Sequence, residues 1–450
     1  MSSNAFYVSV PSVNVIITQV SFASQNPSQL QNQNTAIGKF MFSDSTDKDA
    51  FYRLRVSEPY TLFDGNTIYN NNILFFDYQV VGNCSNSGPV GAAMTHTVNA
   101  NSVTNDFSAQ QTHFYAKYQP GKSFLSMFSF LFGNVTSGIS RRVGFYDTDS
   151  TNNYNPQNGI VLEQNINGVS WTIYQGSPGN TIQQVYQSNW NVDTFNGNGP
   201  SGVTLDFTKN SLGFVDMEWL GVGRVRCGFF VNGVPLVAHV FNNSTQTLPY
   251  INNPYLPIRY EIRKTDNSQA NGSMKAICCS IISEAGYNPI GVNITYPSDD
   301  VKIADNLSQS IIAVRLNSSC PRATLYPISV EIITNLAGTT TAYFTIYLWR
   351  VNIVVGGFTS ITSTPSIAEY NKNDLRTTYN NPLNGTLITL YKSSVSSTNK
   401  ITLSDLPNSL LYAQSSINPS YRDILIVEID TTGVGSSKTY KALLTWKELY

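Results

Sequence analysis

Residues 214–241 read FVDMEWLGVGRVRCGFFVNGVPLVAHVF, and this stretch decides the fold class. Apolar residues recur at every second position on both sides of the Gly221–Gly223 segment, and a period of two is typical of a half-buried β-strand. Asn232-Gly233 then supplies the positive φ angles of a tight hairpin turn, after which the alternation resumes at Val234. The stretch therefore predicts three consecutive antiparallel strands, a β-meander.

β-Branched and aromatic residues are abundant along the whole chain, and no run of ten or more residues keeps the apolar spacing of an amphipathic helix. The sequence thus predicts an all-β protein with two β-sandwich domains, the first a jelly roll of the concanavalin or laminin-G kind. We expect an N-terminal arm over 1–45, the jelly-roll domain over 46–290 and a second, smaller sandwich over 291–450.

The strands expected beside the meander follow the same alternation. In the first domain they span 73–81, 110–118, 123–132, 141–147, 159–164, 169–176, 256–263 and 273–283. In the second domain they span 310–317, 328–335, 341–351, 385–393, 423–430 and 440–449.

Charged side chains are scarce: they make up 12% of the 450 residues, and the formal net charge is −1. A chain without electrostatic excess lacks the basic surface that holds a phosphate backbone, so nucleic-acid binding is not expected.

The longest apolar runs, near 123–133 and 342–358, are too short or are interrupted, so no membrane span is expected either. The N-terminus has no basic region and no compact apolar core, so conventional secretion is not expected.

The residues that commonly ligate metals are spaced in a way that favours structural roles. The cysteines lack CxxC spacing and are interpreted as buried thiols; they are Cys84, Cys227, Cys278, Cys279 and Cys320. The histidines stand outside known metal and catalytic motifs; they are His96, His113 and His239. No cofactor and no metal are expected.

The segment Asp147–Asn153 offers several oxygen ligands at calcium-like spacing. An EF-hand is excluded, because Asn152 stands where the loop glycine should be and Asn158 where the bidentate Glu should be. A looser calcium site and a solvated Asx-rich turn both stay open.

The candidate site residues are Asp216, Glu218, Arg224 and Arg226. Jelly-roll glycoside hydrolases that resemble laminarinases carry Glu-x-Asp-x-Glu on one strand, but Phe214 takes the position of the nucleophile here. A two-carboxylate mechanism therefore lacks one partner, and no catalytic residue is expected. The two arginines should share a face and pair with the two carboxylates across the hairpin. Together the four residues predict a carbohydrate-binding or interface face.

Several tyrosines fall in or near predicted loops: Tyr146, Tyr154, Tyr174, Tyr186 and Tyr250. A planar ring with a polar tip suits sugar stacking and protein interfaces alike. Packing at the edge of a sandwich remains the simpler interpretation of each.

Seven segments follow one another in a distinctive order: DAFYRLRVSEPYTLFDGNTIY (49–69), HFYAKYQPGKS (113–123), RRVGFYD (141–147), QSNWNVDTFNGNGPSGVTLD (187–206), EWLGVGRVRCGFFVNG (218–233), LPIRYEI (256–262) and SMKAICCSIISEAGY (273–287). With the LLTWKE ending (443–448), this series resembles a family of virion structural proteins found in tailed bacteriophages and in large DNA viruses of algae and amoebae. The resemblance implies a non-enzymatic component of the particle: a minor capsid, capsid-surface, tail or fibre protein.

We therefore expect a viral structural protein that works by assembly and binding, located in the virion and assembled in the host cytoplasm. Its expected partners are further copies in a homo-oligomer, other virion proteins and host-surface glycans. A low net charge fits a dense array of copies, which would otherwise repel one another. The alternative is a carbohydrate-binding or carbohydrate-active protein, similar to glycoside hydrolases, built on the same jelly roll.

Overall fold

The computed structural model describes residues 6–10, 13–17, 58–176, 182–288, 290–320, 322–336, 341–362, 366–396, 399–403 and 421–449. The chain divides into two compact units, Met1–Val56 and Ser57–Tyr450. In the first unit, β1 (Phe6–Val10) and β2 (Val13–Ile17) pair as an antiparallel hairpin. The rest of the predicted arm over 1–45 lies outside the described residues.

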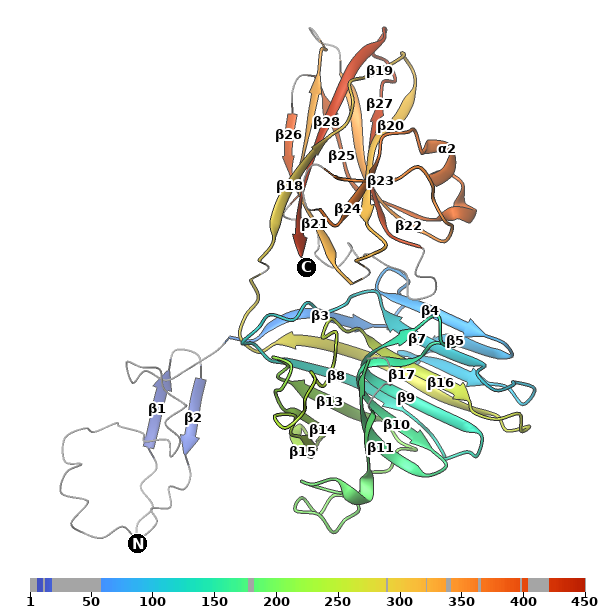
Figure 1. Cartoon of the computed structure of the whole chain (residues 1–450), viewed down its shortest axis with the longest axis vertical. Coiled ribbons are helices and arrows are strands. Elements are labelled where there is room, and N and C mark those ends of the chain that lie inside the picture. Colours follow the sequence, from blue (N-terminus) through green and yellow to red (C-terminus); the bar gives the residue numbers. More distant parts are fainter. Residues whose placement is uncertain are drawn as a thin grey trace, which may run out of the picture. The chain divides into compact units, whose positions relative to one another are not determined.

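The first sandwich contains a seven-stranded sheet. Its strands are β4 (Phe76–Val81), β7 (Phe107–Thr112), β9 (Ile139–Asp149), β10 (Asn155–Asn165), β11 (Gly168–Gln175), β12 (Ile182–Tyr186) and β16 (Ile258–Lys264). They are arranged in the order β12-β11-β10-β9-β16-β7-β4, with every pair antiparallel (Figure 1).

The partner sheet of the first sandwich is eight-stranded. Its strands are β3 (Tyr60–Asn66), β5 (Cys84–Val90), β6 (Ala93–Val98), β8 (Phe124–Leu131), β13 (Ser211–Met217), β14 (Val225–Val231), β15 (Val234–Phe241) and β17 (Gly272–Ser283). The order is β15-β14-β13-β8-β17-β6-β5, and β3 also pairs with β17. Successive strands such as β7, β8 and β9 cross from one sheet to the other, which makes the sandwich a concanavalin-like jelly roll, as predicted.

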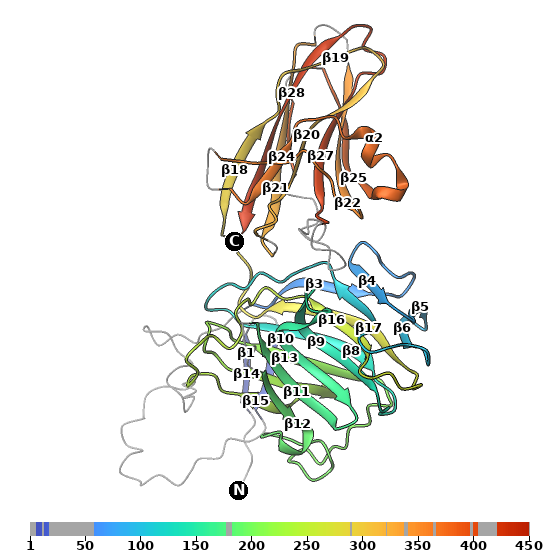
Figure 2. The same cartoon turned by 45° about the vertical axis from the view of Figure 1, so that its right-hand side comes forward.

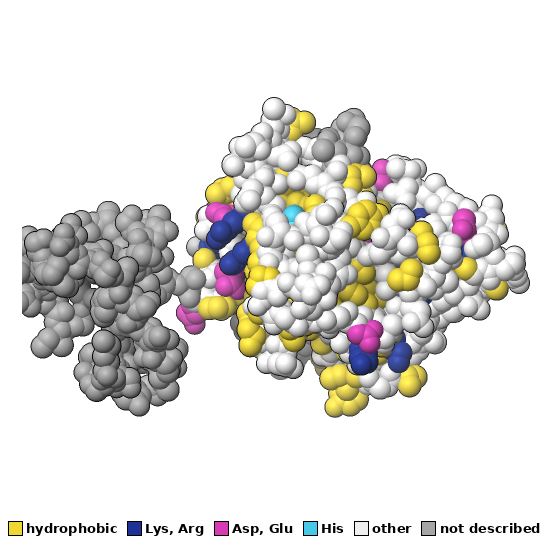
Figure 3. Space-filling model, turned by 90° about the horizontal axis from the view of Figure 1, so that it is seen from below, with side chains coloured by type: hydrophobic (Ala, Val, Ile, Leu, Met, Phe, Trp, Pro, Cys, Tyr) yellow, Lys and Arg dark blue, Asp and Glu magenta, His cyan; other side chains and the backbone are white. Residues whose placement is uncertain are grey.

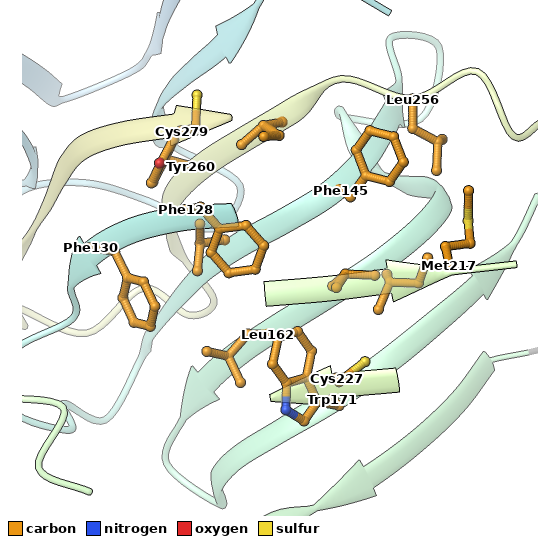
Figure 4. Close-up of a cluster of buried hydrophobic side chains, with 14 of the residues drawn as sticks. Phe128, Phe130, Phe145, Leu162, Trp171, Met217, Cys227, Leu256, Tyr260 and Cys279 are labelled. Atoms are coloured by element: carbon orange, nitrogen blue, oxygen red, sulfur yellow. The ribbon is translucent and has the colours of Figure 1, made fainter. Parts of the chain in front are cut away.

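The two sheets bury one hydrophobic core between them. Along β8, Phe124, Phe128 and Phe130 are buried while their neighbours are half-exposed, because successive strand residues point to opposite faces. Trp171 of β11 meets Phe128 from the other sheet, with ring centroids 6.4 Å apart (Figure 4). Aromatic side chains from both sheets thus supply much of the contact that holds the layers together.

The predicted meander is confirmed as β13, β14 and β15. Asn232 and Gly233 have φ angles of 51° and 80°, the left-handed conformation that a two-residue hairpin turn needs. The first turn is longer and runs from Glu218 to Arg224. Within it, a Cβ on Gly223 would lie 2.0 Å from the carbonyl oxygen of Glu218, so only glycine fits there.

A buried ionic network covers the other face of the seven-stranded sheet. Ile258, Tyr260 and Ile262 of β16 point into the core, so the alternating residues between and after them point away from it. Those residues are Arg259, Glu261 and Arg263, and all three side chains are 3% exposed or less.

Glu261 lies at the centre of this network. Its two carboxylate oxygens accept hydrogen bonds from Arg259 (2.8 Å), Arg263 (2.8 Å) and Arg142 of β9 (3.2 Å). Burial by itself raises the pKa of Glu261, but the three guanidinium groups outweigh it and hold the pKa well below its usual range. Arg142 also donates to Glu163 of β10 at 2.7 Å, which links three neighbouring strands by charge.

His96 of β6 is fully buried between the two sheets. Its Nδ1 lies 2.9 Å from the Ser108 hydroxyl and its Nε2 3.4 Å from the Gln110 amide oxygen. Burial lowers the pKa of His96 to about 4, so the imidazole is neutral in the folded protein at pH 7.

The second sandwich also has two sheets (Figure 2). The strands of its five-stranded sheet are β18 (Val292–Pro297), β19 (Val301–Ile303), β21 (Thr324–Thr334), β26 (Asn399–Thr402) and β28 (Lys438–Leu449). The strands of its six-stranded sheet are β20 (Ser308–Leu316), β22 (Ala342–Val351), β23 (Thr359–Ser360), β24 (Ala368–Asn371), β25 (Gly385–Val395) and β27 (Ile424–Asp430). The orders are β18-β28-β21-β26, with β19 on β28, and β23-β24-β20-β27-β22-β25.

The core of the second sandwich includes Trp446 of β28 and Phe344 of β22. Short helices occur at η3 (Gln187–Asn189), α2 (Arg376–Tyr379) and η4 (Pro382–Asn384). None of the helices that the structure describes is long and apolar enough to cross a membrane. The all-β class is confirmed, while the domain limits near residues 45 and 290 stay predictions.

Some strand predictions were wrong. Residues 113–118 were expected to extend β7, but that strand ends at Thr112, and beyond it only Ala116 pairs, through an isolated bridge to Leu256. The strands β3, β5, β6, β12, β18, β19, β23, β24 and β26 were missed. In β5, for example, the sequence CSNSGPV has no apolar alternation, and the strand is held by backbone pairing with β6.

We expect Glu261→Gln to destabilise the first sandwich by about 3–5 kcal/mol, because it leaves buried guanidinium groups without a full counter-charge. The measurement is the denaturant midpoint of this sandwich. Asp206→Asn is the matched control, since Asp206 forms an exposed pair with Lys209 and its loss should leave the midpoint unchanged. Equal shifts for the two variants would contradict the network's role.

The buried His96 predicts a pH-dependent stability. As the pH falls from 6.5 toward 4, the unfolded chain takes up a proton on this residue and the folded protein does not. The free energy of unfolding should therefore decrease by roughly 3 kcal/mol over this window from His96 alone. His96→Gln should remove this part of the pH dependence in urea unfolding at pH 7 and pH 4.5. A variant with the same pH dependence as the wild type would refute the assignment.

Candidate functional site

A pocket of 170 Å³ opens at one end of the eight-stranded sheet, beside the start of β8, the end of β13 and the start of β14. It is lined by Gly121, Lys122, Ser123, Asp216, Glu218, Arg224 and Arg226. The structure therefore brings all four predicted site residues into one cavity, although they come from two strands and the turn between them.

Asp216 and Arg226 are placed by the pairing of β13 with β14, where they lie directly opposite each other. Val215 and Met217 point into the core, so Asp216 between them points to the outer face. The Arg226 guanidinium donates to the Asp216 carboxylate, which confirms the predicted cross-strand ion pair. Asp216 is thus bound to a cation from its own sheet.

Glu218 and Arg224 continue this pairing only through the backbone. The N–H of Glu218 donates to the carbonyl oxygen of Arg224 at 3.2 Å, and both side chains are exposed. Among the ion pairs of the described residues, none joins these two side chains. Hydrogen bonds to backbone oxygens fix the turn between them: the Tyr250 hydroxyl donates to Glu218 and the Asn243 amide donates to Gly223. The two exposed side chains thus project from a turn whose backbone is held by hydrogen bonds.

Sequence reasoning missed Lys122, which brings a third cation to the pocket. Its ammonium donates to the Gln119 side chain at 2.8 Å and to the Gly286 carbonyl at 3.1 Å. The only signal in the sequence was the turn PGKS at 120–123, which precedes β8. Three cations now stand against two carboxylates in the lining, so the pocket favours an anionic group.

Glu284, just beyond β17, is a further acid near the pocket. Its N–H donates to the Ser123 carbonyl at 2.9 Å. Burial raises the pKa of Glu284, and the negative charge of Asp216 raises it further, while Arg226 opposes the effect. The sequence pattern had no means of placing this residue, because it lies 68 positions from Asp216 along the chain.

The structure also shows why Phe214 takes the position that a nucleophile would need. Its side chain is 4% exposed and packs edge-on against Phe230, with ring centroids 5.3 Å apart. The ring thus forms part of an apolar patch on the outer face of the sheet. Asp216 and Glu218 are therefore the two carboxylates that line the pocket, and Asp216 is paired with Arg226.

The pocket contrasts with the rest of the surface, where charges are few. Figure 3 shows a face on which Lys, Arg, Asp and Glu gather in small groups among uncharged polar side chains. Several of the tyrosines considered for sugar stacking are not on the surface at all: Tyr146, Tyr174 and Tyr250 are buried. Packing is therefore the correct interpretation for these three.

The carboxylates of the segment Asp147–Asn153, considered above as calcium ligands, are bonded to protein groups. Asp147 is buried, accepts hydrogen bonds from the backbone and side chain of Asn158, and pairs with Arg322. Asp149 accepts from the N–H and hydroxyl of Thr151, which is an Asx turn. No group of three metal-ligating side chains occurs among the residues placed by the structure.

The cysteines are free thiols, but their predicted burial is only partly correct. Cys227 and Cys279 are buried, whereas Cys278 is exposed because its side chain faces outward, where Ser129 contacts it. Each histidine has protein partners, and the structural role expected for them stays a prediction. His113 lies 3.2 Å from Asp77, and His239 accepts a hydrogen bond from the backbone of Asn191.

These features define an all-β protein whose concanavalin-like jelly roll carries a small charged pocket. No protein-family model and no curated protein matches the chain. Among solved structures, it is similar to an endo-β-1,4-glucuronan lyase from the fungus Trichoderma reesei, with 11% identity and a TM-score of 0.33 over 49% of this chain and 95% of that one.

Two further solved structures are similar at the same level. Peanut lectin is 12% identical, with a TM-score of 0.31 over 50% of this chain and 98% of its own. The β-glucanase of Bacillus licheniformis is also 12% identical, with a TM-score of 0.31 over 52% of this chain and 100% of its own. At these identities and TM-scores, the likeness assigns neither a ligand nor an activity to this chain.

Proposed function

We propose that this protein is a non-enzymatic structural protein of a virus particle, whose jelly roll binds an acidic saccharide of the host surface. The observation that carries the binding part is the charged pocket, in which three cations outnumber two carboxylates. The pairing of Asp216 with Arg226 supports binding over turnover, because it commits one of the two carboxylates to a structural partner.

The basic side chains of the pocket set the proposed ligand class. Arg224 is exposed and presents a planar guanidinium, which matches a carboxylate or sulfate group through two parallel hydrogen bonds. Lys122 is held in place by Gln119 and Gly286 and supplies a fixed positive charge. The volume of 170 Å³ is below the several hundred typical of pockets for drug-sized ligands, so one sugar unit is the proposed occupant.

The structural role in a particle is supported by the ordered series of segments over residues 49–287 and by the net charge of −1. Nearly neutral copies can be packed densely without mutual repulsion. The proposed partners are further copies of this chain in a homo-oligomer and other virion proteins. The proposed location is the virion, assembled in the host cytoplasm, with the pocket on the outer surface.

One observation favours a carbohydrate-active alternative. Burial and the nearby Asp216 carboxylate raise the pKa of Glu284, and glycoside hydrolysis uses two neighbouring carboxyl groups, of which the one with the raised pKa acts as the acid. In that case Glu284 would be the general acid, and Asp216 would have to leave Arg226 to take part.

Binding is tested with a panel of acidic and neutral oligosaccharides, by calorimetry on the full chain. We expect binding of an acidic saccharide that weakens at least tenfold in Arg224→Gln, since each charge-assisted contact contributes about 1.5–3 kcal/mol. Lys209→Gln is the control, because Lys209 is exposed and lies outside the pocket lining. Equal affinity of Arg224→Gln and wild type would refute the site. Turnover of a saccharide that is lost in Glu284→Gln or Glu218→Gln would establish the hydrolytic alternative instead.

The particle role is tested by locating the chain in purified virions. We expect a low-resolution map to show the two sandwiches in many symmetry-related copies, and antibodies against the full chain to label intact particles. Labelling only after disruption would indicate an internal cement protein and remove host recognition from the proposal. A chain that is missing from purified particles would overturn the structural role.

A further inference from the structure

Lys117 is a buried amine without a hydrogen-bond partner among the described residues. It lies on the connection between β7 and β8, and its residue is 6% exposed. The backbone N–H of the preceding Ala116 donates to Leu256 at 2.9 Å, which fixes the connection to the sheet. An amine that loses its contact with water and gains no hydrogen bond costs free energy. The contact with the Tyr255 ring replaces none of the hydrogen bonds that the amine would make in water.

The side chain of Lys117 borders a cavity of 380 Å³. Tyr255 and Tyr287 contribute aromatic side chains to the lining, and Ile290 and Leu449 contribute aliphatic ones. The Nζ lies 4.4 Å from the centre of the Tyr255 ring. A second cavity of 270 Å³ is also lined by Lys117 and Tyr287, together with Phe75 and Phe114. Lys117 thus adjoins two mostly apolar spaces large enough for a small organic molecule.

The surroundings of Lys117 favour its neutral form. Burial lowers the pKa of the amine well below its usual value, and the positive charge of Arg322 lowers it further. A neutral lysine amine has a free lone pair and is a nucleophile at neutral pH, unlike a surface ammonium group. Lys122 borders the same cavity but donates two hydrogen bonds, so its environment differs in this respect.

We propose that Lys117 is a covalent capture site for a small apolar aldehyde or ketone. The lone pair of Nζ attacks the carbonyl carbon, a C–N bond forms as the C=O π bond breaks, and one proton moves from the nitrogen to the oxygen to give a carbinolamine. Loss of water then gives an imine, and addition of water reverses the reaction, so no oxidant or reductant is needed. The aromatic and aliphatic side chains of the cavity hold the apolar body of the ligand. Lys117 itself does not line the charged pocket, although Lys122 borders both spaces.

The test uses benzaldehyde as the probe on the full-length protein, with cyanoborohydride to reduce the imine and peptide mapping to locate the adduct. We expect labelling of Lys117 at pH 7 to be at least tenfold faster than labelling of Lys122 or of the exposed Lys209. Between pH 7 and pH 9 the rate at Lys117 should depend less steeply on pH than that of a free lysine side chain, because burial lowers the pKa of this amine.

Two variants make the assignment specific. Lys117→Arg and Lys117→Met should each lose the fast adduct and keep the slow adducts at other lysines. Lys117→Met has an unbranched apolar side chain, and it serves as the test if the arginine variant does not fold. If neither variant folds, the comparison of lysines within the wild type decides. Labelling of Lys117 no faster than Lys209, or a fast adduct that persists in a folded variant, overturns the proposal.

Discussion

The first sandwich depends on the interaction of one carboxylate, Glu261, with three arginines on the outer face of the seven-stranded sheet. All seven residues of β16 are buried, although four of them are charged. A buried charge is tolerated only when its partners replace the water that it has lost, and here three guanidinium groups do so. The arrangement also fixes register: a shift of β16 by one residue would turn Arg259, Glu261 and Arg263 toward the aromatic core and leave Arg142 without its partner Glu261.

The sequence was sufficient for the fold class and for the strands whose side chains alternate. The meander is the clearest case, because its apolar period and the Asn232-Gly233 turn agree with each other. The sequence did not predict strands such as β5, which are held by backbone pairing alone. It also did not predict where both faces of a strand are buried. The alternation in β16, IRYEIRK, is typical of a strand with one face in water, and only the three-dimensional structure shows that its charged face is covered. Charges that neutralise one another across strands cannot be recognised without the pairing of those strands.

Of the candidate site, too, only part could be predicted from the sequence. Asp216 and Arg226 could be paired from the sequence, because a hairpin places them opposite each other at a known offset. Lys122, which lines the pocket, and Glu284, which lies near it, could not, because they precede β8 and follow β17, strands that are distant in sequence from the hairpin. These two residues change the interpretation: Lys122 gives the pocket an excess of positive charge, and Glu284 supplies the acid on which a hydrolytic alternative would rest. Lys117 was not recognised either, since burial of a lysine leaves no trace in a sequence pattern.

The position of β16 and β17 in the two sheets has a consequence for how the chain is made. These strands are the last of the first sandwich to leave the ribosome, yet β16 inserts between β9 and β7, and β17 inserts between β8 and β6. Until residue 283 has been synthesised, each sheet therefore exists as two separate pieces with unpaired edges at its centre. A chain that ends before β16 retains most of the strands but no closed layer. The jelly roll is thus completed late and in one step, by a single hairpin-like segment that closes both sheets.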